Sequence, residues 1–382
     1  MLRTDELEQT LRTIAATQYP ELEKHHRSLV RTAERQLERH PLRNEQTALA
    51  RFRLARLRDR FAESLRKDPT DRGHFYNADH HLEVFYLSNK LRHYAESAAL
   101  ARLHTQINPL ELPAGLLERA ATYTEPTVVA YYLVVTLFLY PEEETRFATF
   151  KAFLRESIHH FDHYEQQHLL VYAINYCIDT KINAGRADFF EELFQLYRDA
   201  LGTGILLERD YLPPGHYKNI ITVGMRAGQL QWTEAFIQTH TDRLPPEHRA
   251  DAEAYNLAKL YFHRNDHDRV LEQLRAVTDR NDRYAFGSKI LLLKTYFQLG
   301  EDRPLQSLLE SFRLYVRRHP RLSAPVRRRY LSFLKIFKRL VRLNPYERAE
   351  WAQFRTAVAE EEGLLEREWF LGILEERAGS RE

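Results

Sequence analysis

Residues 256–277 read NLAKLYFHRNDHDRVLEQLRAV, and the spacing of their apolar residues predicts two short helices joined by a tight turn. In the first predicted helix the large Leu257 precedes the small Ala258, and Tyr261 follows three residues later. A small residue allows a neighbouring helix to approach closely, and a large aromatic ring fills the space beside it. Asn265 stands where the turn is expected. The second helix repeats apolar residues at helical spacing, at Val270, Leu274 and Val277.

The same pattern occurs once before and once after this segment. Its turn markers, Gly228, Asn265 and Gly300, are 37 and 35 residues apart. A period of this size is typical of stacked helix pairs and is close to the 34 residues of the tetratricopeptide repeat. Residues 213–320 therefore resemble tetratricopeptide repeats. They depart from that pattern where Val270 and Leu305 replace the small residue of the second helix, and where only Pro245 keeps the closing proline.

Helical periodicity continues through the rest of the chain, with a Pro or Gly break every 15–25 residues and no convincing pair of strands. The fold class predicted is all-α, an α-solenoid of stacked antiparallel helix pairs. The whole chain also resembles helical-repeat proteins of the Bacteroidetes lineage. Four regions are expected: an N-terminal cap of long helices (1–70), degenerate helical repeats (71–212), tetratricopeptide-like repeats (213–320) and C-terminal capping helices (321–382). Within the second region, residues 125–204 are expected to form two helix pairs.

Composition indicates a cytoplasmic protein. The chain has 382 residues, a formal net charge of +2 and one cysteine, Cys177, which excludes an internal disulfide and a cysteine-based zinc site. The N-terminal segment lacks an apolar signal core. The longest apolar run, TVVAYYLVVTLFLY at 127–140, would rise about 21 Å as a helix, which is too short to span a membrane. We expect it to be a buried core helix.

The tetratricopeptide resemblance implies a binding groove on the concave face, because the first helix of each pair lines that face and holds extended peptides. Lys218 and Asn256 coincide with two of the five residues of the carboxylate clamp that some tetratricopeptide proteins use to bind chaperones. Thr222, Gly287 and Leu291 depart from the other three, so we expect a groove that mixes lysines and aromatic rings and suits an acidic peptide. The predicted groove residues are Lys218, Thr222, Tyr255, Asn256, Lys259, Phe262 and Lys294.

Charge is distributed very unevenly near the C-terminus. Residues 311–346 carry eleven Lys and Arg and no Asp or Glu, whereas residues 347–382 carry ten Glu and five Arg. The basic segment either binds an anionic partner such as RNA or DNA, or is neutralised by the acidic helices that follow it, and we favour neutralisation. Its candidate residues are Arg317, Arg318, Arg321, Arg327, Arg328, Arg329, Lys335, Lys338 and Arg339.

Catalytic and metal-binding patterns are weak. Glu156-x-x-His159 and Glu165-x-x-His168 place possible ligands on one helix face, but they lie too close in sequence to face each other from separate helices. No phosphate-binding glycine loop or nucleophile motif is present. We therefore expect no enzymatic activity, no cofactor and no metal.

These patterns predict a protein-interaction scaffold or adaptor that binds a peptide or partner protein in its groove. A nucleic-acid-associated protein that uses residues 311–346 is the alternative from another class. A peptide-sensing regulator, similar to the all-helical tetratricopeptide regulators of bacteria, is a variant of the first. No membrane partner is expected.

Overall fold

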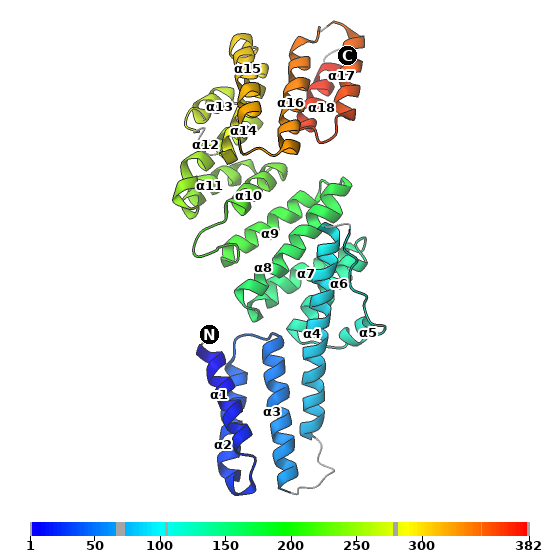
Figure 1. The fold of residues 1–382 in the computed structure, drawn as a ribbon, viewed down its shortest axis with the longest axis vertical. Coiled ribbons are helices and arrows are strands. Elements are labelled where there is room, and N and C mark those ends of the chain that lie inside the picture. The colour runs from blue at the N-terminus through cyan, green and yellow to red at the C-terminus, as the bar shows by residue number, and fades with distance from the viewer. Residues whose placement is uncertain (1, 66–72, 104–105, 278–281, 345, 380–382) are drawn as a thin grey trace. The chain divides into compact units, whose positions relative to one another are not determined.

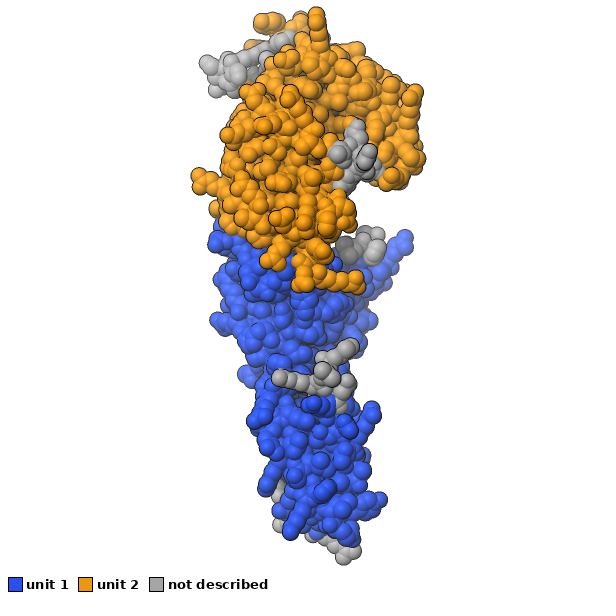
Figure 2. Space-filling model, turned by 90° about the vertical axis from the view of Figure 1, so that its left-hand side faces the viewer, with its two compact units in different colours: residues 1–208 blue, residues 209–382 orange. Residues whose placement is uncertain are grey.

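The computed structural model of the chain describes residues 2–65, 73–103, 106–277, 282–344 and 346–379. Eighteen α-helices make up most of these residues, and no extended strand occurs among them (Figure 1). The predicted all-α fold, with consecutive helices packed against each other, is therefore confirmed. The chain divides into two compact units, residues 1–208 and 209–382 (Figure 2).

Unit 1 begins with long helices. Its helices are α1 (Leu2–Ala16), α2 (Glu23–Arg39), α3 (Glu45–Ser64), α4 (Gly73–Leu103), α5 (Leu116–Ala120), α6 (Pro126–Leu139), α7 (Glu144–Ser157), α8 (His163–Asn175) and α9 (Phe189–Thr203). The two long helices expected near the N-terminus are α2 and α3. Together with α1 they enclose a small core of their own that includes Leu11, Ile14 and Leu37. The two helix pairs expected between residues 125 and 204 are α6 with α7 and α8 with α9.

The apolar run at 127–140 forms α6, and most of its side chains are buried. Such a helix has no polar face because other helices surround it. The expectation of a buried core helix is confirmed. Throughout the described ranges, no helix is both long and apolar enough to cross a membrane.

Unit 2 contains the repeats. Its helices are α10 (Pro214–Arg226), α11 (Leu230–His240), α12 (Arg249–His263), α13 (His267–Leu274), α14 (Asp282–Leu299), α15 (Asp302–Arg318), α16 (Ala324–Arg342), α17 (Arg348–Glu360) and α18 (Arg367–Gly379). Consecutive helices contact each other, and so do the first helices of successive pairs, since α10 contacts α12 and α12 contacts α14.

The three turn markers adopt one conformation. Gly228, Asn265 and Gly300 have φ angles of 73°, 58° and 70°, in the left-handed region that ends a helix. The residue after each marker donates its backbone N–H five residues back: Gln229 to Gly224 (2.8 Å), Asp266 to Tyr261 (2.9 Å) and Glu301 to Tyr296 (3.0 Å). These bonds satisfy a free carbonyl at each helix end. The repeat found in the sequence is thus a repeat of backbone geometry.

Tyr261 and Tyr296 each stand four residues before a turn marker, where the repeat pattern predicts an aromatic ring buried between repeats. Tyr261 is 8% exposed, and its hydroxyl donates to Glu234 of the preceding helix pair (3.3 Å). Tyr296 is only half-buried, although it packs against the core of unit 2. The expectation of burial is confirmed for Tyr261 and too strong for Tyr296.

Helices α16 to α18 share one core with α14 and α15. Phe333, Phe337, Phe354 and Phe370 are completely buried in it, and the ring of Trp369 stacks on Phe337 with centroids 5.4 Å apart. This packing fixes the start of α18, and with it the residues that face the candidate site.

Candidate functional site

Three lysines come from the first helices of successive pairs, and the outer two act electrostatically on the middle one. Lys218 comes from α10, Lys259 from α12 and Lys294 from α14, and the charges of Lys218 and Lys294 both act on Lys259. They approach because α12 contacts both α10 and α14. Lys259 and Lys294 each stand six residues before a turn marker, and Lys218 stands ten residues before its own, which is about one helical turn away on the same helix face. We call these three residues the lysine face.

Lys259, which is half-buried, has the most perturbed charge on this face. Burial, followed by the charge of Lys218, lowers the pKa of its ammonium group to about 8, against the partial compensation of Glu366. A carboxylate paired with this lysine would stabilise its charged form and raise its pKa. The lowered pKa therefore indicates that the negative charge around Lys259 does not balance its positive charge. Neither Lys218 nor Lys259 forms an ion pair with a residue that the structure describes. Lys218 and Lys259 therefore keep positive charge that pairs with no described residue, and Glu366 compensates that of Lys259 only in part.

Lys294 shows which chemistry the lysine face accepts. Its Nζ lies 2.7 Å from Oε2 of Glu366, and it lies over the rings of Phe262 (4.8 Å to the centroid) and Trp369 (5.4 Å). Lys294 is only 8% exposed. A cation between two aromatic faces and a carboxylate is a favourable combination of charge pairing and cation–π attraction.

The start of α18 supplies the acidic groups that meet this face. Glu366 has a φ angle of 58° and accepts backbone hydrogen bonds from Trp369 (3.0 Å) and Phe370 (3.2 Å), so the segment turns sharply into α18. Glu368 forms an ion pair with Arg226 at the end of α10. We call residues 366–369 the cover segment. Sequence reasoning missed it as part of the site and placed Glu366 and Glu368 among the acids that would pair with residues 311–346.

Three other predicted groove residues, Tyr255, Phe262 and Thr222, make contacts of different kinds. Tyr255 is half-buried, and Lys259 lies over its ring with Nζ 6.0 Å from the centroid. A Cβ atom at Gly287 would lie 2.4 Å from the Tyr255 hydroxyl, so this tyrosine requires glycine opposite it. Phe262 contacts Lys294 as described above. The Thr222 hydroxyl is used internally, since it donates to the Lys218 carbonyl (2.9 Å).

Asn256 does not reach the lysine face. Its side chain is completely buried, and its Nδ2 donates to the carbonyl of Ala252 (2.8 Å). Ala252, Asn256 and Leu260 are one turn apart on α12 and all are 0% exposed, because this side of the helix packs into the core. The likeness to a carboxylate clamp therefore does not extend to an accessible asparagine here.

The basic segment 311–346 forms the end of α15 and all of α16. On α16, Arg328, Lys335, Arg339 and Arg342 are exposed, and their spacing of seven, four and three residues places them on one helix face. We call these four residues the basic stripe. None of them forms an ion pair with a residue in the described part of the chain, although Arg342 lies near Glu310.

The remaining residues of the predicted basic patch fall into two groups. Three make internal contacts: Arg327 donates to the carbonyls of His319 (2.9 Å) and Leu322 (3.2 Å), Arg329 to that of Gly363 (3.0 Å), and Lys338 pairs with Glu310 (2.8 Å). The others are exposed: Arg317, Arg318 and Arg321.

The acidic C-terminus covers the basic stripe only in part. Glu360, Glu361 and Glu362 share a hollow of about 410 Å³ with Lys335 and Arg339. Glu366 and Glu368, by contrast, face Lys294 and Arg226. The aromatic residues interleaved with the stripe belong to the core, since Phe333 and Phe337 are fully buried and Tyr330 is half-buried.

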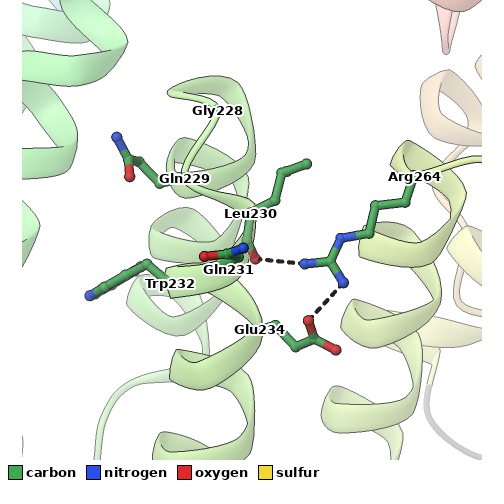
Figure 3. A pocket seen from close by; sticks show the side chains of 7 residues that line it. All are labelled: Gly228, Gln229, Leu230, Gln231, Trp232, Glu234 and Arg264. Carbon is green, nitrogen blue, oxygen red and sulfur yellow. Dashed lines mark hydrogen bonds and ion pairs between the residues drawn. The ribbon is translucent and has the colours of Figure 1, made fainter.

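A larger hollow of about 720 Å³ lies beside the turn between α10 and α11 (Figure 3). Arg264 reaches across it and donates to the carbonyl of Leu230 (3.3 Å) and to Glu234 (2.7 Å), as Figure 3 shows. Its guanidinium group links one helix pair to the next. These contacts stabilise the stacking of one helix pair on the next. The side chains that line the hollow do not form a recognisable catalytic arrangement.

The residues considered for metal binding make separate contacts. The ring of His159 packs on that of His160, the ring of His168 packs on Tyr164, and Glu165 is buried. No group of three or more potential ligands occurs among the residues that the structure describes. Cys177 is completely buried, and burial raises the pKa of its thiol to about 12, so it offers no thiolate near neutral pH.

Glu165 belongs to a buried polar cluster that joins four helices of unit 1. The Tyr131 hydroxyl donates to Oε1 of Glu165 (2.9 Å), and the Arg92 guanidinium lies 3.8 Å from the same atom and 3.6 Å from Glu45. Arg92 also donates to Glu96 (3.0 Å). Burial, together with the charge of Glu45, raises the pKa of Glu165 to about 7.

Comparisons with known protein families, with curated proteins and with solved structures gave no match.

Proposed function

We propose that the protein is an interaction scaffold whose lysine face binds an acidic segment of a partner protein. The single observation that carries this proposal is the charge on Lys218 and Lys259, which lacks an ion-pair partner among the described residues. Lys259 is half-buried and only partly compensated by Glu366. Such a cation favours an incoming carboxylate, because each charge-assisted hydrogen bond is stronger away from bulk water.

The contacts of Lys294 support a preference for acidic segments that also carry an aromatic residue. Glu366 and Trp369 already make such contacts within the chain. A partner would make contacts of the same kind with Lys259 and Lys218, or would displace the cover segment from Lys294. The face lies on the first helices of tetratricopeptide-like repeats, the surface that such repeats offer to extended peptides. A peptide-sensing regulator would use the same face.

The test uses a fluorescent peptide with the sequence of residues 361–370, EEGLLEREWF, titrated with the full-length protein. We expect Lys259→Gln to weaken binding about tenfold, the effect of removing one good charge-assisted hydrogen bond. Because Glu366→Gln together with Glu368→Gln removes competing charge from the cover segment, that double variant should bind the peptide more tightly than the wild type.

Lys289→Gln is the matched control for this titration. Lys289 is also on α14 but lies over the ring of Tyr315, away from the three lysines. Its replacement removes the same charge from the molecule. If Lys289→Gln and Lys259→Gln weaken binding equally, the peptide responds to net charge and the proposed site is wrong.

A second candidate function, association with RNA or DNA, is favoured by the exposure of the basic stripe on one face of α16. Because the aromatic residues interleaved with the basic stripe belong to the core, such binding would rest mainly on phosphate contacts and would show little sequence preference.

For that second function, we expect duplex DNA binding to weaken with salt. Each phosphate that a variant no longer neutralises should reduce the slope of log K against log salt by about 0.9. Replacing Arg328, Lys335 and Arg339 by Gln should therefore flatten the slope by up to about 2.7, whereas Arg303→Gln on α15 should leave it unchanged. Substitutions are preferable to truncation, because α17 and α18 bury Phe354 and Phe370 in the core. Equal slopes for the wild type and the triple variant would exclude the basic stripe as the DNA-binding surface.

A further inference from the structure

A small polar cavity belongs to unit 1, whereas the lysine face belongs to unit 2. Its volume is about 180 Å³, and it is formed where the start of α3, the middle of α4 and the start of α6 meet. At about 30 Å³ for each water, it has room for roughly six water molecules. Its polar lining consists of Arg43, Asn44, Arg51, His81, Glu125 and Thr127, with Thr47 beside them.

Two arginines give this cavity its charge. Arg51 is half-buried, and its guanidinium makes one long hydrogen bond, from Nη2 to the carbonyl of Leu37 (3.5 Å). Arg43 donates to backbone carbonyls, among them that of His40 (2.6 Å). Neither arginine forms an ion pair with a carboxylate in the described ranges. Burial and the charge of Arg43 lower the pKa of Arg51, which is the direction expected where like charges are poorly compensated.

The acidic and imidazole groups around the cavity do not cancel this charge. Glu125 has a partner of its own, since Oε1 lies 2.8 Å from Nε2 of His80. The charge of Glu38 raises the pKa of Arg51, but this effect is smaller than the lowering caused by burial and by the charge of Arg43. Burial, followed by the charges of His80 and Arg51, lowers the pKa of His81 to about 4, so His81 is neutral near pH 7.

Two helices begin at the cavity. Asn44 precedes α3 and accepts a hydrogen bond from the backbone N–H of Thr47 (3.3 Å), and α6 begins with Pro126 and Thr127. Thr127 is 2% exposed, and its hydroxyl has no hydrogen-bond partner among the residues that the structure describes. The positive ends of helix dipoles favour an anion at such a position.

We propose that this cavity binds a phosphate group, either free or carried by a small molecule. Two guanidinium groups beside two helix starts match the charge and the several acceptor oxygens of phosphate. A whole cofactor would not fit, because sites for drug-sized ligands measure about 300–1,000 Å³. The phosphate therefore enters the cavity while any attached group stays outside. This inference is independent of the lysine face.

The test is isothermal titration calorimetry of the full chain with inorganic phosphate and, separately, with glycerol 3-phosphate, each at an ionic strength held constant with NaCl. We expect saturable binding of at least one of them. Arg51→Gln should weaken it by about tenfold to a hundredfold, the effect of removing one charged hydrogen-bonding partner. Thr127→Val, which removes the hydroxyl at nearly constant volume, should cause a smaller loss.

Arg53→Gln is the matched control, because Arg53 is on the same helix but is exposed and pairs with Glu8. It should bind as the wild type does, and circular dichroism of each variant without ligand checks that the fold is retained. Binding of inorganic phosphate would identify the free ion as sufficient, and binding of the ester alone would identify a phosphorylated small molecule. No binding of either ligand at 10 mM, or equal binding by Arg51→Gln and the wild type, would overturn the proposal.

Discussion

Replacing Tyr261 by Ala is expected to lower the free energy of unfolding of unit 2 by about 3–5 kcal/mol, as for other large buried aromatics. The ring fills the contact between two helix pairs, so its removal leaves a cavity that the stacked helices cannot easily close. Unfolding in urea can be followed by tryptophan fluorescence, because Trp232, Trp351 and Trp369 all lie in unit 2.

Two further variants make this prediction specific. Tyr261→Phe keeps the ring and removes only the long hydrogen bond to Glu234, so it should cost about 1 kcal/mol or less. Tyr296→Ala changes the matching but half-buried tyrosine and should cost less than Tyr261→Ala. A greater destabilisation at Tyr296 than at Tyr261 would contradict the burial that we describe.

Glu165 is expected to make unit 1 less stable as the pH rises from 5 to 8. Its pKa is about 7 in the folded protein and has an ordinary value of 4.5, so the folded state binds the proton more tightly. The stability from this group is present below pH 4.5 and is lost as the pH rises through 7. A difference of this size corresponds to about 3 kcal/mol. Glu165→Gln, which still offers an acceptor to Tyr131, should remove this contribution.

The measurement is the free energy of unfolding of wild type minus that of Glu165→Gln, compared at pH 5 and pH 8. Far-ultraviolet circular dichroism reports both units, whereas tryptophan fluorescence reports unit 2 alone, so the effect should appear only in the first signal. Glu96→Gln is the control, because Glu96 is more exposed and also contacts Arg92. A difference that stays constant between the two pH values would mean that Glu165 is not held as we describe.

The sequence was sufficient to predict the repeated helix pairs, because local chemistry determines them. Gly228, Asn265 and Gly300 adopt left-handed backbone angles that few other residues tolerate, and the apolar spacing between them sets the helix faces. The same reasoning identified α6 as a core helix. These predictions depend on residues that are close in sequence.

The candidate site could be predicted only in part, because it joins segments that are distant in sequence. Repeat matching indicated Lys218, Lys259 and Lys294, but Glu366 lies 72 residues after Lys294 and reaches it only through the packing of α16 to α18. Asn256 illustrates the opposite error: its position matches the groove pattern, but its side chain is buried with Ala252 and Leu260 on the core side of α12.

The most direct test of the lysine face is an NMR titration of the full-length protein after ¹³C-methylation of its lysines, which preserves their charge. Addition of the peptide EEGLLEREWF should shift the signals of Lys218, Lys259 and Lys294 and leave those of Lys289 and Lys335 in place. Saturating peptide that moves only Lys335, or no lysine signal, would contradict the proposal that this face receives an acidic partner.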